Sequence, residues 1–375
     1  MNEVFWISAT ILLYVYVGYP ALIWVLARVF GREPGEAVMT PWVTLLIPAY
    51  NEEAHIEAKL ENALELDYPK GRLDIVVASD GSTDRTDEIA RGFADRGVTL
   101  IRMPENAGKA AMLSSVIPRL SGEIVVLSDA SGLLEREALS LLMRKFSDPK
   151  VGCVSGLYRV AGRMDLRDAG EGLYWKYETF IKRQESRLHS ILGAHGALYA
   201  IRGELFPRLE SWEVNDDYLI PMRIVHRGFR AVYEPRAVCW ERETVSVQGE
   251  YARRRRIAVG NCQQMAEIAG LLHPARWWVL FEFLSHKVLR TLAPLFMLAL
   301  LPASLWLEEP WNLIVFGAQA AFYAAALAGY GLQRFGVSVK LLSAPMYFCL
   351  GNLAMLAGVI RYCRGPRGAV WGRVR

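Results

Sequence analysis

The sequence predicts an α/β domain built on a mostly parallel, Rossmann-like sheet, flanked by transmembrane and interfacial helices. Three observations lead to this fold class. Short apolar runs rich in β-branched residues alternate with helical patterns over residues 43–147, which is typical of βαβ units. Long uncharged runs occupy 4–27, 310–333 and 341–360. Hydrophobic residues make up 53% of the 375 residues although 22% are charged, so we expect the charge to be concentrated in a central, water-exposed domain.

The first apolar run predicts an N-terminal transmembrane helix within residues 1–30. Residues 4–27 carry no charge, and this length suffices to cross roughly 30 Å of hydrocarbon. A signal peptide would have a basic start and a shorter apolar core, but only Glu3 precedes the run. We expect three further spans in a C-terminal membrane region over 291–361, at about 291–307, 311–332 and 342–361.

The stretch just before that region combines tryptophan with charge. Residues 274–290 include Trp277 and Trp278 among acidic and basic side chains, which indicates an amphipathic helix lying in the membrane interface. An ordinary soluble amphipathic helix is the alternative.

Basic residues set the expected orientation. Arg28 and Arg32 follow the first span, so the positive-inside rule places the central region in the cytoplasm of a bacterial-type inner membrane. The basic tail, 362–375, conflicts with an odd number of C-terminal spans, and its side of the membrane stays open.

Composition also excludes several classes of protein. The net charge of +4 gives no argument for nucleic-acid binding. The five cysteines are scattered without a CxxC pair, which argues against a zinc cluster or a disulfide framework. The strands are followed by neither GxGxxG nor GxxxxGK[ST], so the usual dinucleotide and P-loop fingerprints are missing.

The central region is predicted to form strands, and each strand is followed by polar residues. Because ligands bind at the carboxyl ends of parallel strands, these polar residues are the candidate site. Strands are expected at 43–49, 73–78, 98–102 and 123–128, and helices at about 52–66, 83–95, 107–119 and 135–147. The polar segments that follow the strands are Asn51-Glu52-Glu53, Asp80-Gly81-Ser82, Asn106-Ala107-Gly108-Lys109 and Asp129-Ala130-Ser131.

These motifs, followed by NDD and RRRRIAVGN, resemble in order and spacing the membrane-embedded family 2 glycosyltransferases, which include hyaluronan, cellulose and chitin-oligomer synthases. The likeness covers about 42–265. It implies a GT-A catalytic domain over those residues and an inverting transferase. It also implies a nucleotide-sugar donor, most simply UDP-linked, and Mg²⁺ or Mn²⁺ as cofactor.

The resemblance assigns donor-side roles to five residues. Ala49 and Glu52 would border the nucleotide, Asp80 would contact its base and ribose, and Lys109 would lie near the diphosphate. Asp129 matches the first acid of the DxD motif that positions the metal, whereas Ser131 stands where the family has a second acid. Serine is a poorer ligand than aspartate for a hard cation, so we expect weaker metal binding or a water in that place. Turn and capping chemistry is the plain alternative for Asp80 and Asp129.

The resemblance places the acceptor after residue 190. The segment around His195 resembles the part of the family that contacts the acceptor sugar, although a buried, hydrogen-bonded histidine is an equal alternative. Counting back from Arg223 and Gly228 places Asp217 at the general-base position and Asp216 at the preceding acid. A carboxylate there would take the proton of the acceptor hydroxyl, whereas two helix-capping acids are the alternative.

A basic run lies where processive synthases carry QxxRW. Arg253 takes the place of Gln, Arg256 that of Arg, and Ile257 that of Trp. Arg256 is expected to contact phosphate, although anionic lipid would attract the same charges. The loss of Gln and Trp weakens the case for a long-chain synthase.

The sequence therefore predicts an integral membrane glycosyltransferase that uses a lipid-linked or growing saccharide acceptor in contact with membrane lipid. Whether it forms oligomers stays open. A processive synthase that exports its product and a catalytically silent partner subunit are the alternatives, and a soluble nucleotidyltransferase conflicts with the apolar spans.

Overall fold

The computed structural model describes residues 1–160, 169–241, 247–266, 273, 276–335, 337 and 339–365. The chain divides into two compact units. The membrane unit contains Met1–Val29, Gly162–Ile181 and Val245–Pro366, and the sheet unit contains Phe30–Ala161 and Lys182–Thr244. Each unit is thus assembled from segments that are far apart in the sequence.

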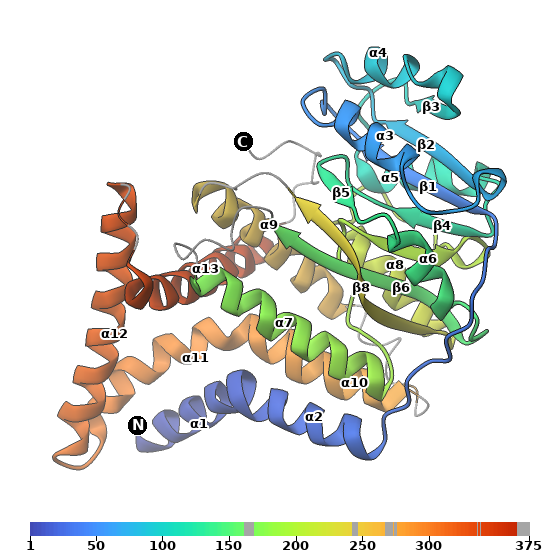
Figure 1. Cartoon of the computed structure of the whole chain (residues 1–375). Coiled ribbons are helices and arrows are strands. Elements are labelled where there is room, and N and C mark those ends of the chain that lie inside the picture. Colours follow the sequence, from blue (N-terminus) through green and yellow to red (C-terminus); the bar gives the residue numbers. More distant parts are fainter. Residues whose placement is uncertain are drawn as a thin grey trace. The chain divides into compact units, whose positions relative to one another are not determined.

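The sheet unit is built on a mixed eight-stranded sheet with the order β3-β2-β1-β4-β7-β6-β8-β5 (Figure 1). Strands β3, β2, β1 and β4 run parallel, whereas β7 pairs antiparallel with both β4 and β6. Strand β8 pairs parallel with β6 and antiparallel with β5. The strands are β1 (Val43–Ala49), β2 (Leu73–Ser79), β3 (Val98–Arg102), β4 (Ile124–Leu127), β5 (Gly132–Leu134), β6 (Val151–Val160), β7 (Tyr199–Arg202) and β8 (Arg230–Glu241).

The first four strands match the predicted ones to within one residue. They were readable from sequence because every residue of β1 and β4 is buried, and strands buried on both faces appear as continuous apolar runs. The helices of this unit are α3 (Ile56–Leu64), α4 (Thr86–Arg91), α5 (Lys109–Val116), α6 (Ala138–Lys145) and α8 (Asp216–His226), with short 3₁₀ turns η2 (Lys70–Arg72), η3 (Ala94–Arg96), η4 (Ile117–Arg119) and η5 (Gly203–Leu205).

All secondary-structure elements in the described part of the membrane unit are helices. Four of its helical segments are long and apolar enough to cross a membrane: Asn2–Val29, Trp277–Trp306, Trp311–Arg334 and Lys340–Cys363. Its elements are α1 (Asn2–Leu13), η1 (Tyr14–Gly18), α2 (Tyr19–Val29), α7 (Ala169–Leu188, whose last turns belong to the sheet unit), α9 (Val247–Ala266), α10 (Trp277–Glu282), η8 (Phe283–Val288), α11 (Leu289–Ala303), η9 (Ser304–Trp306), α12 (Trp311–Arg334) and α13 (Lys340–Cys363).

One boundary differs from the sequence-based expectation. The segment predicted as a separate interfacial helix, 274–290, continues without a break into the next predicted span, so that α10, η8 and α11 form one helical run. Residues 274 and 275 and the end of the basic tail, from residue 366 onward, lie outside the described residues. The described polar residues at the start of this run are therefore part of the same continuous helical segment as α11.

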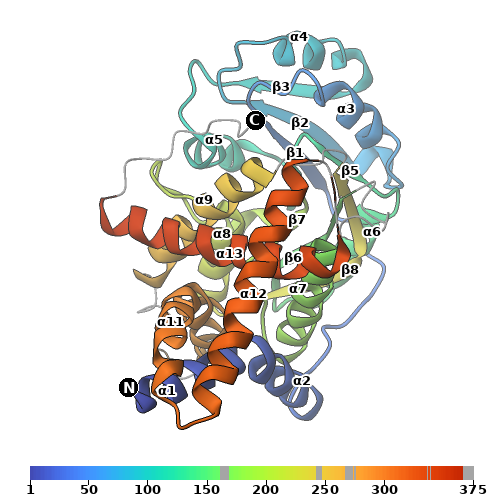
Figure 2. The ribbon, with the colours of Figure 1, turned by 90° about the vertical axis from the view of Figure 1, so that its left-hand side faces the viewer.

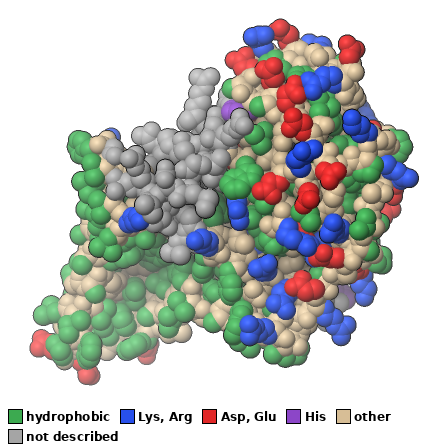
Figure 3. Space-filling view, in the orientation of Figure 1, with side chains coloured by type: hydrophobic (Ala, Val, Ile, Leu, Met, Phe, Trp, Pro, Cys, Tyr) green, Lys and Arg blue, Asp and Glu red, His purple; other side chains and the backbone are tan. Residues whose placement is uncertain are grey.

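The helices of the membrane unit pack through small and polar contacts. In both Figure 1 and Figure 2, α1 runs beside α11, and the Tyr14 and Ser285 hydroxyls are 2.8 Å apart. Helix α13 packs so closely on α9 that a Cβ added at Gly358 would lie 2.3 Å from that of Ala258, a close approach typical of membrane helices. Figure 3 shows mostly hydrophobic side chains on the visible surface of α12, whereas charges of both signs are mixed over the sheet unit.

Candidate active site

The parallel strands bring their carboxyl ends to one edge of the sheet. Strand β1 lies between β2 and β4, so the segments after Ala49, Ser79 and Leu127 meet there. The buried Ala49 ends β1, and its carbonyl accepts a hydrogen bond from the Asp80 amide at 2.9 Å. Of the nucleotide residues predicted from sequence, Ala49, Asp80 and Asp129 therefore lie at the carboxyl ends of three adjacent strands.

The turn after β1 is tied to the turn after β2. Asn51 has a positive φ of 56°, a conformation that asparagine tolerates better than most residues. Its side-chain oxygen accepts a hydrogen bond from the Thr83 amide at 2.8 Å. The Glu52 amide donates to the Thr86 hydroxyl at 2.8 Å, and the Glu52 carboxylate lies 2.9 Å from Nδ1 of His55. Glu52 is thus held at the rim of this edge.

Asp80 organises the loop that precedes Lys109. The residue is fully buried, and its two carboxylate oxygens accept hydrogen bonds from the amides of Ala107 (3.0 Å) and Gly108 (2.9 Å). Gly81, with φ +67°, permits this arrangement, because an added Cβ would lie 2.5 Å from the Glu105 backbone. The predicted contact of Asp80 with base and ribose stays a prediction; in the structure the carboxylate holds the loop.

Lys109 is the central cation of the site. Its Nζ lies 3.2 Å from Asp129 Oδ1 and 3.3 Å from Asp216 Oδ2. Burial opposes the charge, but the carboxylates of Asp129, Asp216 and Asp217 outweigh it and hold the pKa of Lys109 above its usual range. One protonated lysine therefore connects a donor-side acid with an acid predicted on the acceptor side.

The loop that carries Asp129 rests on a second lysine, Lys59. Lys59 is fully buried, and its Nζ donates to Ser128 Oγ at 2.6 Å and to the Gly132 carbonyl at 2.5 Å. Burial lowers the pKa of Lys59 to about 8, against smaller opposing effects of Cys239 and Asp129. Lys59 thus ties both ends of the loop to α3, while the Asp129 side chain stays 42% exposed.

The oxygen donors here suit a hard divalent cation. Asp129 offers an exposed carboxylate. The hydroxyl of Ser131, two residues further along the chain, donates to Glu241 Oε1 at 3.0 Å. Mg²⁺ and Mn²⁺ prefer such oxygens and commonly share their coordination with substrate phosphates. In the described residues, no group of three His, Cys, Asp or Glu side chains could hold a metal alone. The residues present therefore fit a cation that a diphosphate helps to bind.

The two acids of the NDD motif begin helix α8. Asn215, with φ 64°, is the N-cap, and the first turn presents Asp216 and Asp217 on different sides. Asp216 Oδ2 accepts a hydrogen bond from the Tyr199 hydroxyl at 3.0 Å. The Asp217 carboxylate instead lies beside Gly196, where an added Cβ would be 3.3 Å from Oδ2. Asp216 is held by neighbours in this way, whereas Asp217 borders the predicted acceptor segment.

His195 lies in that same segment. Its amide donates to Ser155 Oγ at 2.9 Å, and its ring centroid is 5.9 Å from that of Tyr233. The amide of the preceding residue, Ala194, donates to the Asp217 carbonyl at 2.7 Å. The backbone around His195 is therefore held close to the candidate base.

The predicted phosphate contacts lie on α9, in the membrane unit. Arg256 is exposed on this helix, and the side chain of Arg253 lies outside the described part of the structure. Their contact with phosphate stays a prediction.

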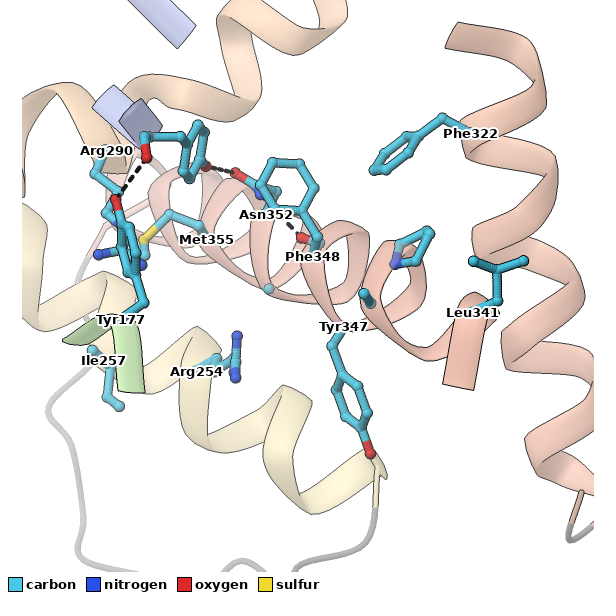
Figure 4. A pocket seen from close by; sticks show the side chains of 14 residues that line it. Tyr177, Arg254, Ile257, Arg290, Phe322, Leu341, Tyr347, Phe348, Asn352 and Met355 are labelled. Carbon is cyan, nitrogen blue, oxygen red and sulfur yellow. Dashed lines mark hydrogen bonds between the residues drawn. The ribbon is translucent and has the colours of Figure 1, made fainter. Parts of the chain in front are cut away.

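A neighbouring arginine on α9 lines a cavity of about 710 Å³ in the membrane unit (Figure 4). Arg254 reaches α13 and packs against Gly351, where an added Cβ would lie 2.5 Å from Nη1. The Tyr16 hydroxyl crosses to Asn352 Oδ1 at 3.0 Å, and Arg290 pairs with Glu178. The other walls are mainly aromatic and aliphatic: Tyr177, Ile257, Phe322, Leu341, Ala344, Pro345, Tyr347, Phe348 and Met355.

Sequence reasoning missed three residues of the site. Tyr199 and Glu241 come from strands outside the four predicted ones, so nothing in the local sequence indicated where they pair. Lys59 carried a usable signal: it shares a helix face with Ile56, Leu60 and Ala63, all buried. A lysine on an apolar helix face must find partners inside the protein.

A mixed sheet with Asp80, Lys109 and Asp129 at its carboxyl edge and paired acids facing them has the arrangement of a GT-A domain. The sequence profile described as "Glycosyltransferase like family 2" matches residues 41–260. The chain belongs to glycosyltransferase family 2.

Curated relatives support this membership. The probable glycosyltransferase YdaM of Bacillus subtilis is 29% identical over 243 residues, which cover 59% of this chain and 55% of that protein. The poly-beta-1,6-N-acetyl-D-glucosamine synthase of Staphylococcus aureus is 27% identical over 224 residues, 58% of this chain and 54% of that protein. The chain thus spans about half the length of the curated relatives it matches.

A solved structure matches nearly the whole chain. The mannosyltransferase PcManGT from Pyrobaculum calidifontis, in complex with GDP-Man and Mn²⁺, is 27% identical with a TM-score of 0.70. The match covers 96% of this chain and 99% of that one. The likeness therefore includes the membrane helices as well as the GT-A sheet.

Proposed function

We propose that this protein is an inverting, membrane-integrated glycosyltransferase whose catalytic sheet unit faces the cytoplasm. It transfers a sugar from a nucleotide-sugar donor to a lipid-linked or growing saccharide acceptor. The observation that carries the proposal is Lys109, which lies within 3.3 Å of both Asp129 and Asp216. The Lys109 ammonium contacts both carboxylates at once. It is therefore placed to bind a diphosphate on the Asp129 side while the acceptor hydroxyl reacts on the Asp216 side.

The reaction is a single displacement. The acceptor hydroxyl oxygen forms a bond to the anomeric carbon while the bond from that carbon to the donor phosphate oxygen breaks. The nucleoside diphosphate leaves with the bonding electron pair, and the hydroxyl proton passes to the Asp217 carboxylate. Lys109 stabilises the charge that grows on the diphosphate, and Asp216 holds Lys109 in place. When bound beside Asp129, a divalent cation supplies further neutralisation of that charge.

Two nucleotide sugars are candidate donors for this protein. The sequence favours a UDP-linked sugar. GDP-mannose is the second candidate, because the relative solved with it matches nearly the whole chain.

The apolar cavity supports an acceptor that arrives in the membrane. It is lined by two arginines and several aromatic side chains (Figure 4). Such a lining can hold a hydrocarbon chain or sugar rings next to an anionic group. A processive synthase that also exports its product is the alternative within the class, and a silent partner subunit is the alternative outside it.

A nucleotide-release assay on the full-length protein in detergent tests the proposal. Parallel reactions contain UDP- or GDP-sugars, Mn²⁺ or Mg²⁺, and a membrane lipid extract as the acceptor source. The proposal predicts lipid-dependent release of one nucleoside diphosphate and sugar label in the lipid fraction. Water-soluble polymer as the main product would favour the processive synthase, and no release with any donor would favour the silent subunit.

A further inference from the structure

The metal-binding motif of this chain lacks its second acid, and another strand brings a carboxylate to the vacant position. Where a DxD motif carries two aspartates, the chain reads Asp129-Ala130-Ser131. Ser131 Oγ donates to Glu241 Oε1 at 3.0 Å. Glu241 ends β8, directly opposite Gly132 in the register of β5. The carboxylate therefore lies about one hydrogen bond beyond the short serine side chain, on the side to which that side chain points.

Glu241 is fixed in this position from both sides. The Tyr158 hydroxyl of β6 donates to its other oxygen, Oε2, so neither oxygen relies on solvent alone. β5 and β8 approach closely because position 132 is glycine: an added Cβ would lie 2.5 Å from Cys239 Sγ. A carboxylate held by two hydroxyl donors is preorganised, and its remaining lone pairs stay available to a further ligand.

Ser131 links the two acids. It lies two residues after Asp129, between β4 and β5, and its hydroxyl donates a hydrogen bond to Glu241 at the end of β8. Two carboxylates with a hydroxyl between them make a hard-oxygen set of the kind that Mg²⁺ and Mn²⁺ prefer.

We propose that Glu241 supplies the second carboxylate of the divalent-metal site, in place of the acid that Ser131 lacks. Ser131 and Tyr158 hold Glu241 by hydrogen bonds, and Asp129 provides the first carboxylate. This inference rests on the proposed use of a metal-bound nucleotide donor. It differs from a purely structural role, in which Glu241 would only connect β5, β6 and β8.

The test measures Mn²⁺ affinity and requires no turnover. Full-length protein in detergent is titrated with Mn²⁺ in the presence of UDP or GDP, and free Mn²⁺ is followed by electron paramagnetic resonance. Glu241→Gln should weaken Mn²⁺ binding by about 10–100-fold, because the amide keeps the shape and one acceptor oxygen but lacks the charge. Glu135→Gln is the matched control: Glu135 is an exposed acid that pairs with Trp240 Nε1 at 2.9 Å, and its loss should leave the affinity unchanged.

Moving the carboxylate separates a ligand from a structural residue. The double variant Ser131→Asp/Glu241→Gln restores the acid at the motif position, and it should recover most of the lost Mn²⁺ affinity. Tyr158→Phe, which leaves the carboxylate but removes one donor, should weaken binding several-fold. If Glu241→Gln does not fold, the Mn²⁺ affinity of Tyr158→Phe decides whether Glu241 is a ligand: an unchanged affinity would contradict the proposal.

Two results would overturn the proposal: wild-type Mn²⁺ affinity in Glu241→Gln, or no recovery in a folded double variant. Either would leave the proposed function intact, because Asp129 and the diphosphate would then bind the metal without Glu241. If the wild-type protein bound no Mn²⁺ in the presence of UDP and none in the presence of GDP, the metal-dependent donor chemistry itself would be contradicted.

Discussion

The Nζ atom of Lys109 lies 3.3 Å from Oδ2 of Asp216, so the first residue of α5 touches the first residue of α8. These residues were assigned to opposite sides of the site, Lys109 to the donor diphosphate and Asp216 to the acceptor. Their contact joins the two sides directly. Donor binding and acceptor activation should therefore respond together when this pair is disturbed.

Replacement of Lys109 by Met should weaken donor binding by about tenfold or more, since hydrogen bonds to charged groups contribute roughly 1.5–3 kcal/mol. Because the folded pKa of Lys109 is raised, its stabilising charge is fully present below the unfolded pKa near 10.4 and is lost only above it. Donor affinity by calorimetry at pH 7 is the measurement, with the exposed Lys70→Met as control. Equal affinities in the two variants would contradict the assignment.

Asp129→Ala should abolish metal-dependent donor binding while the protein still folds, because the Asp129 side chain is 42% exposed and leaves little packing behind. Calorimetric titrations of nucleotide sugar with and without Mn²⁺ should show a metal effect in the wild type only. A variant that binds donor and metal normally would show that Asp129 merely caps the following turn.

Lys59 should make stability depend on pH in the alkaline range. Its folded pKa of about 8 lies below its unfolded value, so between the two values the unfolded state binds more protons. The free energy of unfolding therefore rises with pH there. Below pH 8 both states are protonated, and the cost of burying the charge is fully present. Between pH 7 and pH 10, the melting temperature of the wild type should rise relative to that of Lys59→Met. If the difference between the two melting temperatures does not change with pH, the low pKa of Lys59 is contradicted.

Gly358→Ala should destabilise the membrane unit, because the added Cβ would lie 2.3 Å from Ala258 Cβ and 2.8 Å from the Arg255 carbonyl. Overpacking of this kind costs about 1–3 kcal/mol. Gly317→Ala is the matched control, since that glycine is also in a membrane helix and has nothing within 4 Å of an added Cβ. Thermal melting in detergent should be lowered only for Gly358→Ala, and equal melting of both variants would refute the close packing of α9 and α13.

The parallel half of the sheet and its polar strand ends could be predicted because the information is local. Apolar runs such as 43–49 are followed at once by the residues that matter, and topology alone gathers them at one edge. The other half could not be predicted in the same way. Glu241 meets Ser131 only through the antiparallel pairing of β5 with β8, and Tyr199 meets Asp216 only because β7 is inserted between β4 and β6.

Local patterns in the membrane unit did not show where one helix continues into the next. The charged, Trp-rich stretch 274–290 favoured a separate interfacial helix, yet it continues into α11. Its polar side chains find partners within the unit: Arg290 pairs with Glu178, and the Ser285 hydroxyl lies near that of Tyr14. Composition alone cannot distinguish side chains that face headgroups from side chains that are satisfied by neighbouring helices.

Asp217→Asn provides the most direct test of the catalytic assignment. The amide keeps the size of the side chain but cannot accept the hydroxyl proton, so transfer should fall by about 10²–10⁴-fold. Donor affinity should stay near the wild-type value, because the Asp217 carboxylate borders Gly196, whereas Lys109 keeps its ion pairs with Asp129 and Asp216. Asp216→Asn, measured alongside, should lose less turnover. Wild-type turnover in Asp217→Asn, with or without loss in Asp216→Asn, would contradict the account of this site as a base-assisted glycosyl transfer centre.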